Sequence, residues 1–120
     1  MEQEQYWALQ QRRARDLLYE EVVVLRKRAG FRLKLYSAPD GHLDPQMPRI
    51  HPGGTFRICA LATSSDGRRV CAQLNTNHWV NILVQYNLQG DFRPQWYVRR
   101  TTMPAPPPER ARTARRKRMA

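Results

Sequence analysis

The sequence predicts an α+β fold in which one N-terminal amphipathic helix packs on a four- to five-stranded antiparallel sheet. Apolar residues recur with a helical period over 2–29 and then alternate with a period of two in segments up to residue 102. The length of 120 residues suits one compact domain with a tail. We therefore expect a single domain over 1–103, followed over 104–120 by a Pro-rich spacer and a disordered Arg-rich tail.

The predicted helix covers 2–29. Gly30 follows as a candidate C-cap, and the basic triplet 26–28 complements the negative end of the helix dipole. The run of three valines at 22–24 is the competing signal, because β-branched residues favour strands. We favour the helix and expect its apolar stripe to face the sheet. The stripe consists of Trp7, Ala14, Leu18, Val22, Leu25 and Ala29.

The predicted strands cover 31–36, 55–62, 70–75, 79–88 and 95–102. The segment 39–54 is rich in Pro and Gly and predicts a loop. Strand 79–88 has the strictest alternation, with Val80, Ile82, Val84, Tyr86 and Leu88 on one face. The last strand begins after Pro94, since proline cannot donate to a neighbouring strand.

Asp66 and Gly67 predict a type I′ hairpin turn. With these two residues as the loop, Cys71 lies opposite Ala62, and Cys59 points to the other face of the ladder. We therefore expect no disulfide between the two cysteines. Their predicted separation favours a reducing compartment, the nucleus or the cytoplasm.

Positive charge dominates the composition. The formal net charge is +11, and only Lys27, Lys34 and Lys117 among the 21 basic residues are not Arg. Arg pairs with phosphate through a planar fork and stacks on bases, so the bias favours polyanion partners. The codon bias of a GC-rich genome would produce the same composition. No apolar run is long enough for a membrane span, and the acidic, polar first residues argue against a secretory signal.

The densest charge lies in the tail, where six cations occur within nine residues. If all six contacted phosphates, binding would show a log–log salt slope of about −5 on duplex DNA and about −4 on a single strand. The same string resembles a nuclear import signal, which is compatible with nucleic-acid binding; a membrane-surface contact and a solubilising role also stay open. Residues 104–108 predict a stiff polyproline spacer. The six cations are Arg110, Arg112, Arg115, Arg116, Lys117 and Arg118.

A second candidate site is the outer face of the predicted sheet, where cations alternate with tyrosines. Single-stranded nucleic acid needs this combination, since phosphates pair with Arg and unstacked bases pack on aromatic rings. An ordinary solvated sheet face is the competing interpretation, and we favour it as long as the strand order is unknown. The candidate residues are Arg32, Lys34, Arg57, Arg99, Tyr36 and Tyr97.

No catalytic or metal-binding pattern is recognisable. The three histidines are scattered without metal-ligand spacing, and the acids of the predicted sheet region lie in turns. We expect no enzyme, no cofactor and no metal. The tryptophans are expected in helix–sheet contacts, although Trp7 leaves a homodimer open.

These observations predict a small, basic, non-enzymatic nucleic-acid-binding accessory protein, largely sequence-tolerant, with RNA favoured over DNA. The alternative is a protein–protein adaptor or regulator whose tail is a nuclear localisation signal that binds an import receptor. Its working surface would be the helix face or the Pro/Gly loop. The composition resembles that of a viral accessory protein or a ribonucleoprotein component.

Overall fold

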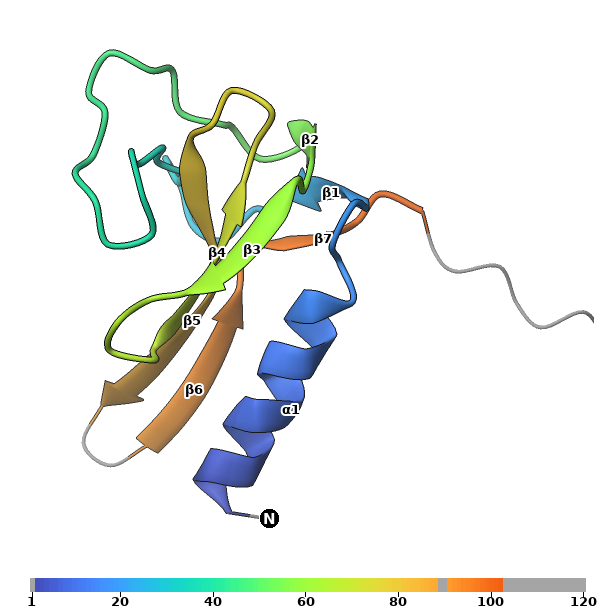
Figure 1. Ribbon diagram of the computed structural model, residues 1–120, viewed down its shortest axis with the longest axis vertical. Coiled ribbons are helices and arrows are strands. Elements are labelled where there is room, and N and C mark those ends of the chain that lie inside the picture. Colours follow the sequence, from blue (N-terminus) through green and yellow to red (C-terminus); the bar gives the residue numbers. More distant parts are fainter. Residues whose placement is uncertain (1, 89–90, 103–120) are drawn as a thin grey trace, which may run out of the picture.

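The computed structural model describes residues 2–88 and 91–102 and shows one helix packed on two antiparallel sheets (Figure 1). The first element is α1 (Gln3–Arg15). The four-stranded sheet has the order β3 (Ala60–Thr63), β4 (Arg69–Gln73), β5 (Trp79–Leu88), β6 (Asp91–Trp96). The three-stranded sheet has the order β2 (Thr55–Arg57), β1 (Glu21–Val24), β7 (Val98–Arg100). The predicted α+β class is confirmed, with the strands divided between two sheets. The tail 104–120 lies outside the described residues.

The helix is shorter than predicted, because the valine run belongs to a strand. α1 ends at Arg15, and a positive φ of 65° at Tyr19 turns the chain into β1. β1 is the central strand of its sheet and pairs with β2 on one side and β7 on the other. Val22 and Val24 are 0% and 2% exposed. Burial between two partner strands outweighs the helical period that extended the prediction to residue 29.

Indole groups attach α1 to the four-stranded sheet. The Trp7 indole N–H donates to the carbonyl oxygen of Gly67 at 2.9 Å, and the ring packs edge-on against Phe92. The Trp96 indole N–H donates to the side-chain oxygen of Gln10 at 2.9 Å. Trp7 and Ala14 of the predicted stripe are therefore buried in the core, as expected, whereas Leu18 lies beyond the end of α1 and is 37% exposed. Trp7 is buried within this chain, which removes it as an exposed dimer anchor.

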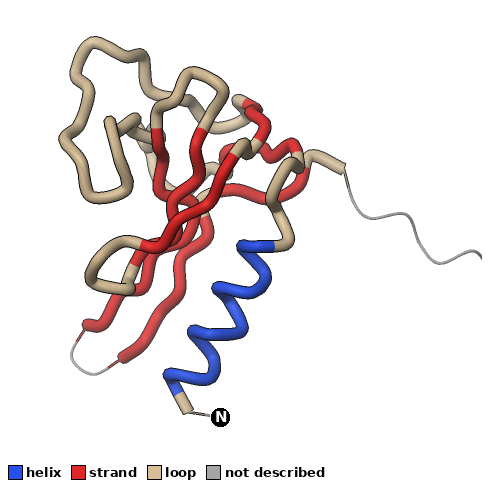
Figure 2. Tube along the Cα trace, viewed as in Figure 1, coloured by secondary structure: helices blue, strands red, loops and turns tan. Residues whose placement is uncertain are grey.

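Two stretches of chain cross from one sheet to the other (Figure 2). The predicted strand 55–62 divides into β2 and β3 at Ile58 and Cys59. The predicted strand 95–102 divides at Tyr97, whose N–H donates to Ile82 of β5 while its carbonyl accepts from Leu25 beyond β1. Pro94 lies inside β6 instead of before it. This position is allowed because β6 is an edge strand.

The β3–β4 hairpin has the predicted register but a different turn. Ala62 lies opposite Cys71, as expected. Gly67 alone takes a positive φ in this turn, 74°, and its N–H donates to Ser64 at 2.9 Å, so the turn is not type I′. Both cysteines are free.

Between β1 and β2, residues 25–54 contain isolated bridges but no regular strand (Figure 2). The predicted strand at 31–36 therefore forms no ladder, although its alternation is real. Leu33 and Leu35 are buried, and Arg32 and Lys34 point outward. Two backbone hydrogen bonds of 2.8 Å between Tyr36 and Trp79 hold this segment against the start of β5. The loop predicted over 39–54 is confirmed.

Candidate nucleic-acid interface

A basic aromatic groove lies on the face of β5 and β6 that points away from α1. It consists of two adjoining hollows of about 270 and 350 Å³, which share Arg28, Tyr86 and Tyr97. Phe92 and Trp96 of β6 contact α1, whereas Arg93 and Gln95, one residue out of phase, line the groove. The other lining residues come from segment 27–36, β4 and β5: Lys27, Phe31, Arg32, Leu33, Lys34, Tyr36, Arg69, Asn81 and Val84.

A β-bulge in β5 brings these side chains to one face. Val70 pairs with Leu83 and the next residue, Cys71, pairs with Asn81, so Ile82 has no opposing residue in β4. The extra residue reverses the alternation. Asn81 therefore shares a face with Val84 and Tyr86, while Ile82 and Leu83 are both fully buried. The strict alternation predicted along 79–88 is wrong from this point on.

Aromatic rings form the centre of the groove. Phe31 and Tyr97 stack with ring centroids 5.3 Å apart and an interplanar angle of 16°. The Tyr97 and Tyr86 hydroxyls share a hydrogen bond of 2.6 Å. Burial, followed by this bond, raises the pKa of Tyr97, so its phenol stays protonated at neutral pH. Tyr86 remains 41% exposed and offers ring surface to a ligand.

Cations surround the rings. The Arg28 guanidinium carbon lies 5.8 Å from the Phe31 centroid, and Lys27 Nζ lies 6.0 Å from that of Tyr97. No Asp or Glu is among the described residues that line the two hollows. Positive charges that line a cleft with walls of low dielectric constant concentrate the electric field there and raise the local concentration of anions. The six basic lining residues are Lys27, Arg28, Arg32, Lys34, Arg69 and Arg93.

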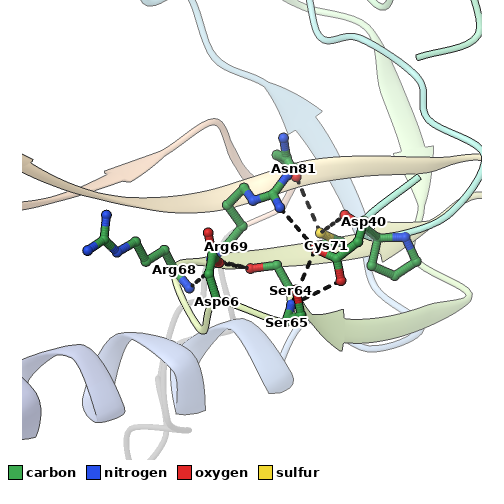
Figure 3. Close-up of polar contacts among 9 residues, drawn as sticks. Asp40, Ser64, Ser65, Asp66, Arg68, Arg69, Cys71 and Asn81 are labelled. Atoms are coloured by element: carbon green, nitrogen blue, oxygen red, sulfur yellow. Dashed lines mark hydrogen bonds and ion pairs between the residues drawn. The ribbon is translucent and has the colours of Figure 1, made fainter. Parts of the chain in front are cut away.

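One carboxylate approaches the groove from outside its lining (Figure 3). Asp40 pairs with the Arg69 guanidinium at 3.1 Å and accepts from the Ser65 N–H at 3.0 Å. Because the Arg69 and Asp40 side chains are 30% and 46% exposed, water screens the pair and the attraction is modest. Asp40 is thus an internal anion that competes for Arg69.

The groove contains four of the six residues predicted on the sheet face: Arg32, Lys34, Tyr36 and Tyr97. Arg57 and Arg99 lie elsewhere, on the outer face of the three-stranded sheet. Arg57 is opposite Glu21 and donates to the Tyr19 carbonyl at 2.6 Å, and Arg99 is opposite Val23. The six tail cations, Arg110 to Arg118, lie outside the described residues.

Sequence reasoning missed several residues that line the groove. Tyr86 was predicted on the same face as Val80 and Ile82, and the bulge that separates it from them has no local signature. Lys27 and Arg28 were assigned to the end of a helix. The valine run was a weak signal for the position of Lys27 and Arg28, since a strand at 22–24 means that the helix ends before these two residues. Arg69 stood out only as one of a pair of arginines after the Asp-Gly turn.

Two of the three histidines, His51 and His78, make side-chain contacts. His78 Nε2 lies 3.0 Å from Asp44, and this hydrogen bond is the main cause that lowers the pKa of Asp44. His51 lies 3.4 Å from the Arg32 side chain. Within 2–88 and 91–102, no three His, Cys, Asp or Glu residues are grouped so that they could hold a metal ion. No helix in the described part of the chain is long and apolar enough to cross a bilayer.

Comparisons with known proteins add no family to this description. No protein-family model, no curated protein and no solved structure matches the chain.

Proposed function

We propose that this protein is a non-enzymatic nucleic-acid-binding protein that holds single-stranded RNA or DNA in the basic aromatic groove, with RNA favoured. The observation that carries the proposal is the joint lining of the two hollows: six basic residues around four aromatic rings, with no carboxylate among the described lining residues. Phosphates pair with the cations, and unstacked bases pack on the rings.

The groove suits a single strand better than a duplex. Bases in a duplex are already stacked on one another, so the exposed ring of Tyr86 would have no partner. Stacking on an aromatic side chain contributes about 1–3 kcal/mol per base and tolerates any base. Binding through phosphates and stacking is therefore largely sequence-tolerant.

The tail adds electrostatic capture. Its six cations match the six of the groove in number, and each set would contribute a salt slope of about −4 on a single strand if every cation contacted a phosphate. The tail alone cannot position a base, because it contains no aromatic residue. The tail therefore adds affinity that depends on salt, and the groove positions the bases.

A salt-titrated binding series tests the proposal. The full chain, a form lacking 108–120 and the double variant Arg28→Gln/Lys34→Gln are titrated with single-stranded and duplex RNA and DNA. We expect the groove variant to lower the single-strand salt slope by about 1.4, since two phosphate contacts are lost. Removal of the tail should greatly weaken retention at physiological salt.

The matched control is Arg12→Gln/Arg13→Gln, which removes the same charge from α1 on the other side of the sheet. Its slope should equal that of the unaltered chain. Equal losses in the two double variants would mean that only net charge matters, and the groove would not be the site. No salt-dependent binding of the intact chain to any of the four nucleic acids would refute the function itself.

The adaptor alternative has one observation in its favour. An apolar hollow of about 500 Å³ near the end of α1 is lined by Leu17, Leu25, Trp96 and Val98 together with charged residues. The helix face suggested for this role is, however, packed on the sheet. If the protein is an adaptor, deletion of the tail should change its cellular location, while the shortened chain should still bind its protein partner in a pull-down.

A further inference from the structure

Asn81 presents an oriented amide to the smaller hollow of the groove. Its side-chain oxygen accepts a hydrogen bond from the Cys71 thiol, with Sγ and Oδ1 3.3 Å apart (Figure 3). Cys71 is 1% exposed, and its other neighbouring acceptor is the Pro39 carbonyl oxygen at 3.8 Å. Burial raises the pKa of Cys71 to about 11, so the thiol keeps its proton at neutral pH and acts as a donor.

This contact determines which end of the amide a ligand meets. With the oxygen occupied by the thiol, the amide nitrogen is the end left for a ligand, and it carries two N–H donors. The charged groups around it, Arg28, Arg32, Lys34 and Arg69, also only donate. Apart from the tyrosine hydroxyls, the described side chains that line this hollow therefore offer hydrogen-bond donors and no acceptors.

A donor-rich hollow discriminates among bases. Uracil and thymine present two carbonyl oxygens and no exocyclic amine. Cytosine and guanine each have one carbonyl oxygen and one exocyclic amine, and adenine has the amine and no carbonyl oxygen. The volume of about 270 Å³ is below the roughly 300–1,000 Å³ of pockets for drug-sized ligands, which suits one base.

We propose that this hollow takes one unpaired uracil or thymine, whose carbonyl oxygen accepts from the Asn81 amide, and that Cys71 is the residue that positions this amide. The inference rests on the proposed function and deepens it: phosphate contacts and stacking hold any single strand, and one position within it is read. A neutral hydrogen bond contributes about 0.5–1.5 kcal/mol net, so the preference should be modest, about twofold to twelvefold.

The test compares oligomers of uridine, thymidine, adenosine and cytidine of one length, titrated into the full chain and followed by fluorescence anisotropy. We expect uridine and thymidine oligomers to bind about twofold to twelvefold more tightly than the others. Asn81→Ala should abolish this difference, because uridine and thymidine oligomers then lose the contact with the amide and bind no more tightly than adenosine oligomers.

Two Cys71 variants separate positioning from packing. Cys71→Ser retains a donor for Oδ1 and should keep most of the base preference. Cys71→Ala removes the donor, frees the amide to rotate and should reduce the preference. Melting temperatures measured by circular dichroism identify any variant that has lost its fold, and the Asn81 variant, at a partly exposed position, then carries the test alone.

The outcomes distinguish the two levels of the argument. Absence of binding to every oligomer would refute the proposed function and this inference with it. Equal binding of all four oligomers, or a uridine preference that survives in Asn81→Ala, would overturn the reading of a base at Asn81 and leave single-strand binding intact.

Discussion

Replacement of Asp40 by asparagine tests whether Arg69 contacts nucleic acid. The Asp40 carboxylate accepts from Arg69 at 3.1 Å and from the Ser65 N–H at 3.0 Å. Asparagine has almost the same shape and keeps one carbonyl oxygen for Ser65, so Asp40→Asn removes the charge and leaves the turn its acceptor. We expect tighter binding of single strands, because the Arg69 guanidinium no longer has to give up its ion pair with Asp40 before it contacts a phosphate.

The size of the gain follows from the exposure of the pair. Because the Arg69 and Asp40 side chains are 30% and 46% exposed, the interaction is that of a screened surface pair. Such pairs contribute about 0.2–1 kcal/mol, which corresponds to an affinity gain of about 1.4-fold to 5-fold. One additional phosphate contact would also make the single-strand salt slope steeper by about 0.7.

The assay is anisotropy of a labelled uridine oligomer across a salt series, with Asp40→Asn, Arg69→Gln and the double variant. Arg69→Gln should weaken binding, and the double variant should equal it, because the gain acts only through the guanidinium. An unchanged or lower affinity in Asp40→Asn with a normal melting temperature would refute a role for Arg69. The same role would be refuted if Asp40→Asn raised the affinity equally in a chain that already carries Arg69→Gln.

Three further predictions concern stability and reactivity. Gly67→Ala should lower the free energy of unfolding by about 1–2 kcal/mol in urea denaturation, because a φ of 74° is strained for alanine. The added Cβ meets nothing within 4 Å, so no steric clash adds to this loss. A loss no larger than that of an alanine substitution at an exposed strand position would contradict this prediction. The His78 hydrogen bond lowers the pKa of Asp44, so its carboxylate stabilises the fold above the unfolded pKa of about 3.9, and this contribution disappears as the pH falls through the lower folded value. Asp44→Asn should therefore be less stable than the unaltered chain at pH 7, with the gap closing in acid; a constant gap across pH would count against it. At pH 8 a thiol reagent should modify Cys59 well before Cys71, whose burial raises its pKa to about 11, and equally fast labelling would disprove this protection.

Much of the local structure could be predicted because neighbouring residues encode it. The helix that begins near Glu2, the β5 segment and the loop rich in Pro and Gly follow from periodicity and breaker residues. The pairing of Ala62 with Cys71 follows from the position of the Asp-Gly turn, even though the turn type differs. Within the candidate site, Arg32 and Lys34 could be placed outward because Leu33 and Leu35 alternate with them.

Only the tertiary structure decided where the helix stops and which side chains share the groove. Within 16–29 a helical period and a β-branched run predict different structures. The strand β1 forms because strands 55–57 and 98–100 flank it and bury Val22 and Val24. The bulge at Ile82 depends likewise on how β5 pairs with β4, and it puts Tyr86 on the face where its hydroxyl contacts that of Tyr97. Periodicity is a property of adjacent residues and can be read from the chain, whereas pairing free energy depends on partners far away in sequence. For this reason the sequence by itself determined the charge, the fold class and most of the elements, and the arrangement that brings cations and rings together was determined by the packing of the two sheets.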